Sequence, residues 1–255
     1  AMRGEMGIPG VLTAPQWGFY DVLFSKTNKD QKLKPEQERQ FSLPQPFGSY
    51  VMENILFKIS FPAEFHAQTA AEAAVKLHPE VKDRLDDIHR IVLTTHESAI
   101  RIISKVGKLA NAADRDHCLQ YMAAVPLIFG SLRAEHYEDG FHQSNPIIDR
   151  IRAKMEVVED ERYSREYLEE DKRSIANAIQ VFFSDGTKTE KVEVEYPIGH
   201  RRRRTEGMPE LEKKFRYNLE TRFPPVRCDA ISTMFSSQNK LESVAVPEFM
   251  QLFVI

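Results

Sequence analysis

The chain has 255 residues, of which 42% are hydrophobic and 29% charged, and its formal net charge is −3. This composition is typical of a soluble globular protein with one or two domains. The near-balanced charge gives no drive towards nucleic acid or anionic membranes, and the apolar runs are too short to span a bilayer.

The sequence holds only two cysteines, Cys118 and Cys228, which stand far apart. So few thiols argue against a disulfide framework and a cysteine zinc site, and they exclude a cysteine-ligated iron–sulfur cluster. We therefore expect no metal and no cofactor, so that any chemistry relies on acid, base and cationic side chains.

The first 47 residues precede the regular pattern. Residues 1–24 carry glycines, prolines and then aromatic residues, which predicts a loop and a short helix, and residues 25–47 are polar and predict a loop. The start has no secretory apolar stretch and is unlike a translation start ahead of a fold, so we expect a piece of a longer protein.

A strand-to-helix corner is the most distinctive local feature. Apolar alternation from Tyr50 to Ile59 predicts a strand, which Pro62 ends, and an alanine-rich helix follows from Glu64 to Leu77. The corner gathers a cation, an acid, an imidazole and an amide, namely Lys58, Glu64, His66 and Gln68. These groups could bind and deprotonate a carboxylate-bearing substrate, although an ordinary polar helix start has the same composition.

Helix and strand signals then alternate. They predict helices at Pro79–Asp86, Ser98–Ser104, Asp114–Gly130 and Asn145–Arg152, and strands at Ile88–Thr95 and Lys154–Val158. Asp114 is expected to cap its helix, Pro126 to kink it and Gly130 to end it. Residues 159–171 are strongly charged and predict a surface segment.

A hairpin is the clearest strand signal. Ile175–Phe183 and Thr187–Tyr196 flank an Asp-Gly pair that favours a type I′ turn. Three more helices are predicted after it, at Pro209–Phe223, Arg227–Ser236 and Val246–Phe253. The element order predicts an α+β domain over residues 48–200, with a mainly antiparallel sheet covered by helices, and flanking segments 1–47 and 201–255 outside it.

Two further clusters could serve a carboxylate substrate. His117 and Tyr121 lie one turn apart on a helix, although a capping histidine and a core tyrosine with its hydroxyl tied off are the alternatives. His200 precedes four consecutive arginines, which could bind carboxylates, lie on a solvated face or form a dimer contact. Consecutive side chains point in different directions, so one or two arginines at most can reach one ligand. Of the remaining histidines, expected to be structural or on the surface, His96 after a strand is the best candidate.

Several stretches resemble the MmgE/PrpD family, in order along almost the whole chain. They include KISFPAEFHAQTAAEAA from residue 58, ADRDHCLQYM from 113, KRSIANAI from 172, VEYPIGHRRRR from 194 and EFMQLFVI at the end. The resemblance covers only the C-terminal half of the family's length. It implies that segments 1–47 and 201–255 belong to a helical domain whose bulk, with further catalytic residues, lies in the other half.

The resemblance also implies a function. We expect a cofactor-free hydro-lyase that removes water from the tricarboxylate 2-methylcitrate in propionate breakdown. The whole enzyme is expected to be a homodimer, in the cytoplasm or, in a eukaryote, in the mitochondrial matrix. The chain alone is expected to have little turnover. Decarboxylation of cis-aconitate, epimerisation of a dicarboxylate, and a non-catalytic tricarboxylate-binding or assembly module are the alternatives.

The site residues follow from both arguments. Lys58 and Tyr121 resemble a functional lysine and tyrosine of the family's cis-aconitate decarboxylase, and Gln68 stands where that relative has a histidine, which favours His66 for acid–base work. The predicted catalytic residues are therefore His66, Tyr121 and Lys58. The predicted substrate-binding residues are Glu64, Gln68, His117, His200, Arg201 and Arg202.

Overall fold

A computed structural model describes residues 4, 7, 10–23 and 55–255, which belong to two units, residues 1–53 and 54–255. In the first unit, α1 (Phe19–Leu23) confirms the predicted short helix. The predicted loop at 25–47 and the first part of the predicted strand, residues 50–54, lie outside the described residues. No helix within the described ranges is long and apolar enough to cross a membrane.

The second unit is built on one four-stranded sheet with strand order β2-β1-β3-β4. The strands are β1 (Ile88–Thr95), β2 (Met155–Glu159), β3 (Asn177–Phe183) and β4 (Val192–Val194). The β1–β2 pair is parallel, whereas β1–β3 and β3–β4 are antiparallel. The predicted α+β class and the strands predicted at 88–95 and 154–158 are therefore confirmed. The predicted hairpin forms, but its second arm is a strand only at Val192–Val194, with one isolated bridge between Phe182 and Lys188.

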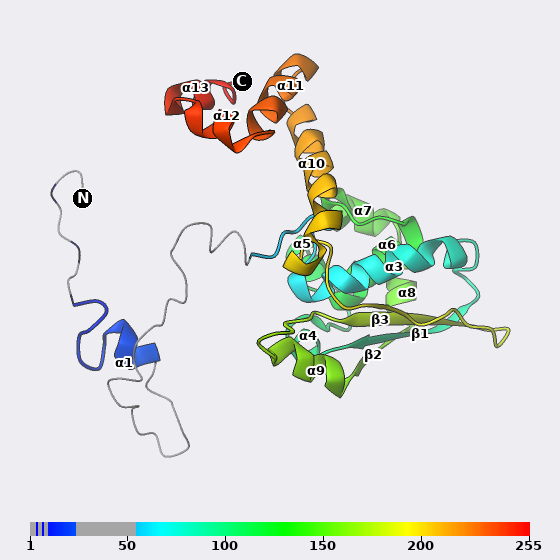
Figure 1. Cartoon of the computed structure of the whole chain (residues 1–255). Coiled ribbons are helices and arrows are strands. Elements are labelled where there is room, and N and C mark those ends of the chain that lie inside the picture. The colour runs from blue at the N-terminus through cyan, green and yellow to red at the C-terminus, as the bar shows by residue number, and fades with distance from the viewer. Residues whose placement is uncertain (1–3, 5–6, 8–9, 24–54) are drawn as a thin grey trace. The chain divides into compact units, whose positions relative to one another are not determined.

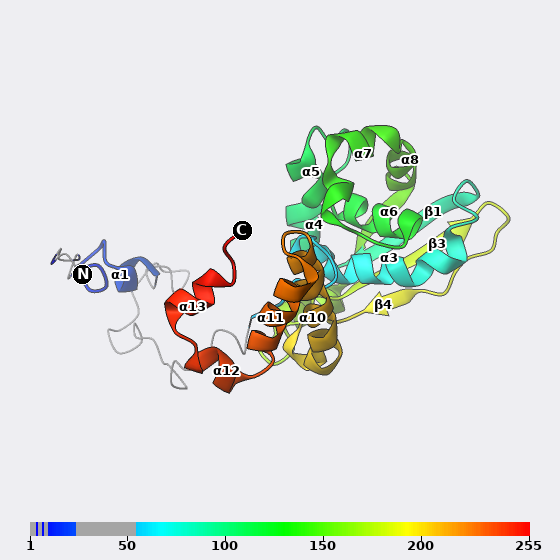
Figure 2. The same cartoon turned by 90° about the horizontal axis from the view of Figure 1, so that it is seen from above.

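Helices cover both faces of this sheet (Figure 1). One face carries α3 (Gln68–Val81) and α6 (Leu119–Phe129), and the other carries α4 (Glu97–Ile103) and α9 (Glu161–Leu168). Figure 2 shows α3 lying along the sheet, and its fully buried alanines, Ala70, Ala71, Ala73 and Ala74, let it pack closely there. This core holds the start of α3, where the predicted corner lies.

The corner itself differs from the prediction. Residues 55–59 are not a strand; they dock onto a later loop, where the Phe57 N–H donates to the Gly199 carbonyl at 3.1 Å. A short 3₁₀ helix, η2 (Phe65–Ala67), precedes α3. Pro79 lies inside α3, so the predicted separate helix that begins at that residue is wrong. Because proline has no backbone N–H, α3 lacks one hydrogen bond in its last turn, and the helix still continues to Val81.

Two other local predictions are corrected. The helix predicted over 114–130 is divided into α5 (Ala112–Asp116) and α6, and Asn111, not Asp114, caps the first part. Gly130 ends α6 with a positive φ of 71°, as predicted. In the hairpin turn only Gly186 has a positive φ, at 85°, so the turn is not type I′, which needs two such residues.

The remaining helices flank this core. They are η3 (Ala134–Tyr137), α7 (Asp139–Ser144), α8 (Ile147–Arg152), η4 (Arg201–Arg203), α10 (Arg204–Glu220), α11 (Pro225–Phe235), α12 (Gln238–Ser243) and α13 (Val246–Gln251). Figure 1 shows α10 leading away from the sheet towards α11–α13. These last helices have a small core of their own, Leu219, Cys228 and Ile231, and leave Val226, Phe235, Val246 and Met250 exposed.

Candidate functional site

The side chains of Glu64 and His66 form a hydrogen-bonded pair at the start of η2. Glu64 caps this turn, because its Oε2 accepts from the His66 N–H at 2.8 Å. The His66 Nδ1 atom lies 2.8 and 2.9 Å from the two carboxylate oxygens. A carboxylate at Nδ1 favours the tautomer with its proton there, so Nε2 carries the free lone pair.

Two aromatic side chains from other elements surround the Nε2 side of His66. The Tyr167 hydroxyl, on α9, lies 3.3 Å from Nε2 and in this tautomer donates to it. His96, which caps α4, stacks on Tyr167 with ring centroids 4.7 Å apart, and its ring lies 5.1 Å from that of His66. The corner, α4 and α9 thus converge on one imidazole.

The charges of this cluster are set by its burial. Burial lowers the pKa of His96 to about 4, assisted by the charge of His66, so His96 is neutral near pH 7. Burial alone would raise the pKa of Glu64, but the hydrogen bond and charge of His66, and the charge of His117, outweigh it and lower that pKa. The His96 Nε2 atom is buried and has no hydrogen-bond partner in the described part of the chain.

Lys58 contributes to a second, cationic part of the corner. Its ammonium lies 4.8 Å from the centre of the Phe65 ring, directly before His66. Lys214, on α10, donates to the Lys58 carbonyl, and burial together with the charge of Lys58 lowers the pKa of Lys214. Within the described residues neither ammonium pairs with a carboxylate, so an anionic ligand would relieve their repulsion.

A hollow of about 470 Å³ is lined by Lys214, but not by Lys58. Its polar and charged lining comprises Ser60, Arg133, Glu135, Glu210, Lys213, Lys214, Tyr217 and Asn218. Lys213 is paired with Glu210 at 2.6 Å, which leaves Arg133 and Lys214 as the cations with the weakest acidic contacts, Arg133 lying 3.9 Å from Glu135. A volume of this order suits a small carboxylate-bearing molecule.

Three other predicted residues are held by local contacts. The Gln68 amide is buried and donates to the carbonyls of Phe61 and Ala63, at 3.0 and 2.7 Å. The Tyr121 hydroxyl is buried and donates to the His136 carbonyl at 2.6 Å, and burial raises its pKa to about 12. His117 is exposed, with Nδ1 2.6 Å from Asp116.

The segment after Gly199 divides its cations among several partners. His200 is buried and caps η4, accepting from the Arg202 N–H at 3.1 Å; burial, with the charges of the arginines, lowers its pKa to about 4. The Arg202 guanidinium donates to the Asp171 carbonyl, and Arg203 pairs with Glu72 at 2.8 Å. Arg201, at the start of η4, is exposed and makes contacts of its own.

The structure therefore brings Glu64 and His66 together and keeps His117 within electrostatic range, and it adds His96 and Tyr167. The sequence argument missed Tyr167, because a charged stretch conceals a helix whose Tyr163 and Tyr167 share one face at i, i+4 spacing. No group of three or more His, Cys, Asp or Glu side chains able to hold a metal ion occurs in the described ranges.

The chain is similar to known proteins along its whole length. Residues 61–240 match the MmgE/PrpD C-terminal domain. The chain is 51% identical to 2-methylcitrate dehydratase of Cupriavidus necator, covering 100% of this chain and 51% of that protein. Identity is 50% with the mitochondrial 2-methylcitrate dehydratase of Yarrowia lipolytica, over 99% and 46% of the two chains, and 48% with the Escherichia coli enzyme, over 100% and 51%. The chain thus spans about half the length of these relatives.

Proposed function

Because the chain belongs to the MmgE/PrpD family, we propose that it is the C-terminal part of a 2-methylcitrate dehydratase. This enzyme would eliminate water from 2-methylcitrate to give 2-methyl-cis-aconitate. The observation that carries the proposal is the His66–Glu64 pair, whose Nδ1–Oε1 distance is 2.8 Å. A histidine with one nitrogen held by a carboxylate is a suitable general base for a carbon acid.

The proposed reaction needs one proton removed and one supplied. His66 Nε2 takes the proton from the carbon next to a substrate carboxylate, and Glu64 stabilises the imidazolium that results. The departing hydroxyl takes a proton from a donor and leaves as water. Tyr167, 3.3 Å from Nε2, is a suitable donor, since the imidazolium can then return a proton to its oxygen.

Lys58 and its neighbours are proposed to bind the carboxylates of the substrate. 2-Methylcitrate carries three negative charges, and the Lys58–Lys214 pair offers two ammonium groups without a carboxylate partner in the described residues. Arg201 and Arg202 remain candidates for another carboxylate, as do His117 and His200. Gln68 is proposed to act through the shape of the corner, because its amide joins Phe61 to Ala63.

The helices after residue 200 are proposed to pack against a part of the protein that precedes this chain. Their exposed apolar side chains, such as Val226 at 82% and Val246 at 74%, would then become buried. Together with residues 1–47 they would complete a helical domain that supplies further catalytic groups. We further propose a homodimer, located in the cytoplasm or, in a eukaryote, in the mitochondrial matrix.

The experiment replaces His66 by Gln in this chain combined with the N-terminal half. Formation of 2-methyl-cis-aconitate should fall about 100-fold or more, the range of a lost general base. An unchanged rate would refute the assignment of His66. Release of carbon dioxide from cis-aconitate by the unsubstituted protein, combined with the N-terminal half, would instead favour the decarboxylase alternative.

A further inference from the structure

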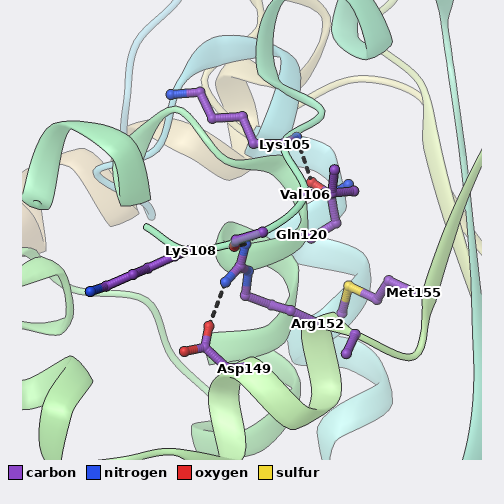
Figure 3. A pocket seen from close by; sticks show the side chains of 9 residues that line it. Lys105, Val106, Lys108, Gln120, Asp149, Arg152 and Met155 are labelled. Atoms are coloured by element: carbon purple, nitrogen blue, oxygen red, sulfur yellow. Dashed lines mark hydrogen bonds and ion pairs between the residues drawn. The ribbon is translucent and has the colours of Figure 1, made fainter. Parts of the chain in front are cut away.

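A second hollow lies where residues 105–108, in the loop that follows α4, meet α8. It has a volume of about 450 Å³, and its lining includes Lys105, Lys108, Gln120, Asp149, Arg152 and Met155 (Figure 3). None of these residues belongs to the Glu64–His66 cluster. The volume lies within the range of small-molecule sites.

Positive charge exceeds negative charge around this hollow. Arg152 is buried, donates to Asp149 and to the Gly107 carbonyl, and keeps an Nε–H without a partner in the described part of the chain. Lys105 lies 3.6 Å from Asp114. Lys108 is exposed and has no charged partner within the described residues, so one full positive charge is left uncompensated.

The loop backbone adds further donors. The N–H groups of Val106, Gly107 and Lys108 make no hydrogen bond within the described residues. Gly107 has a φ of +84°, a conformation that only glycine adopts readily, and the loop bends here. Successive free N–H groups in such a turn favour anions.

We propose that this loop–α8 hollow binds a small multivalent anion through carboxylate or phosphate oxygens. Lys105 and Lys108 supply the mobile charges, and the loop N–H groups supply hydrogen bonds. Arg152, fixed by Asp149, holds the loop through the Gly107 carbonyl. The site is separate from the proposed catalytic cluster and does not depend on the reaction proposed for it.

Isothermal titration calorimetry of the 255-residue chain at low ionic strength tests this proposal, with inorganic phosphate and with citrate as probes. At least one probe should bind saturably, and Lys108→Gln should weaken it about tenfold, the effect of one charge-assisted hydrogen bond. The preferred probe identifies the anion class. Lys82→Gln is the matched control, because Lys82 is also an exposed lysine, but it follows the C-terminus of α3 and does not line the hollow.

His66→Gln separates this site from the catalytic cluster, since citrate resembles the proposed substrate. Binding at the loop–α8 hollow should survive that substitution. The proposal is overturned if neither probe binds, if Lys108→Gln and Lys82→Gln have equal effects, or if His66→Gln abolishes the binding.

Discussion

His66 Nδ1 lies 2.8 Å from Oε1 of Glu64, and the same carboxylate accepts from the His66 backbone N–H. One acid therefore fixes both the turn and the ring that the turn presents. Both side chains are mostly buried, at 12% and 17% exposed, so water competes little for the contact. The pair leaves the proton-accepting lone pair on the opposite ring nitrogen, where the Tyr167 hydroxyl donates to it.

Replacing Glu64 by Gln should reduce turnover of the assembled enzyme more than its stability. The amide can still cap η2, but it no longer stabilises a protonated His66. We expect kcat to fall about tenfold to 100-fold, with the pH profile shifted. Steady-state kinetics over a pH series measures this effect. Glu190→Gln, at an exposed acid on the hairpin, is the control and should leave kcat unchanged.

The buried histidines should make the fold less stable in mild acid. The pKa of His96 is lowered to about 4, so between pH 6.5 and 4 the unfolded chain binds more protons than the folded one. The free energy of unfolding therefore decreases as the pH is lowered through this range. The slope is at most about 1.4 kcal/mol per pH unit for this group. His96→Asn, which can still cap α4, should flatten the curve measured by urea unfolding. An equally steep curve for the variant would contradict the pKa direction.

Tyr121→Phe distinguishes a structural tyrosine from a catalytic one. Loss of the hydroxyl removes its 2.6 Å hydrogen bond to the His136 carbonyl, which should cost about 1 kcal/mol of unfolding free energy. If Tyr121 also acts on substrate, kcat should fall at least tenfold at a temperature where the variant is fully folded. Thermal unfolding and kinetics on the same preparation separate the two contributions.

Gly199→Ala should disturb the docking of residues 55–59. A Cβ at this position would lie 1.7 Å from the Phe57 carbonyl oxygen, so the two backbones must separate. We expect a loss of about 1–3 kcal/mol in unfolding free energy, as for an overpacked contact. Gly140→Ala is the matched control, because a Cβ there meets no atom within 4 Å. Equal stability of the two variants would argue against the close approach.

Much of the sheet could be predicted from local patterns. The strand at 88–95 was predicted with its observed bounds, because β-branched residues fill it and charged turns flank it. The segment 50–59 also alternates, yet its described part pairs with a loop through Phe57 and Gly199, a long-range contact that alternation does not encode. Asn111 and Asp114 are both residue types that cap helices, and the structure has Asn111 as the N-cap of α5. Which of the two caps the helix depends on the path of the backbone, which the sequence pattern does not reveal.

The candidate site was predictable only in part. Glu64 and His66 are two residues apart, so their contact depends on one turn. His96 caps the start of α4, whereas Tyr167 lies in the last turn of α9. The parallel β1–β2 pairing places these two helices, which follow the two strands, beside each other. That pairing is a property of the fold, and no spacing in the sequence reveals it.

The most direct test of this account is the rate of 2-methylcitrate dehydration by the 255-residue chain, alone and after addition of the N-terminal half. We expect almost no turnover from the chain alone and recovery of activity in the mixture, with His66→Gln suppressing that recovery. Turnover by the isolated chain near the rate of a full-length enzyme would contradict the proposal that the N-terminal half supplies further catalytic groups.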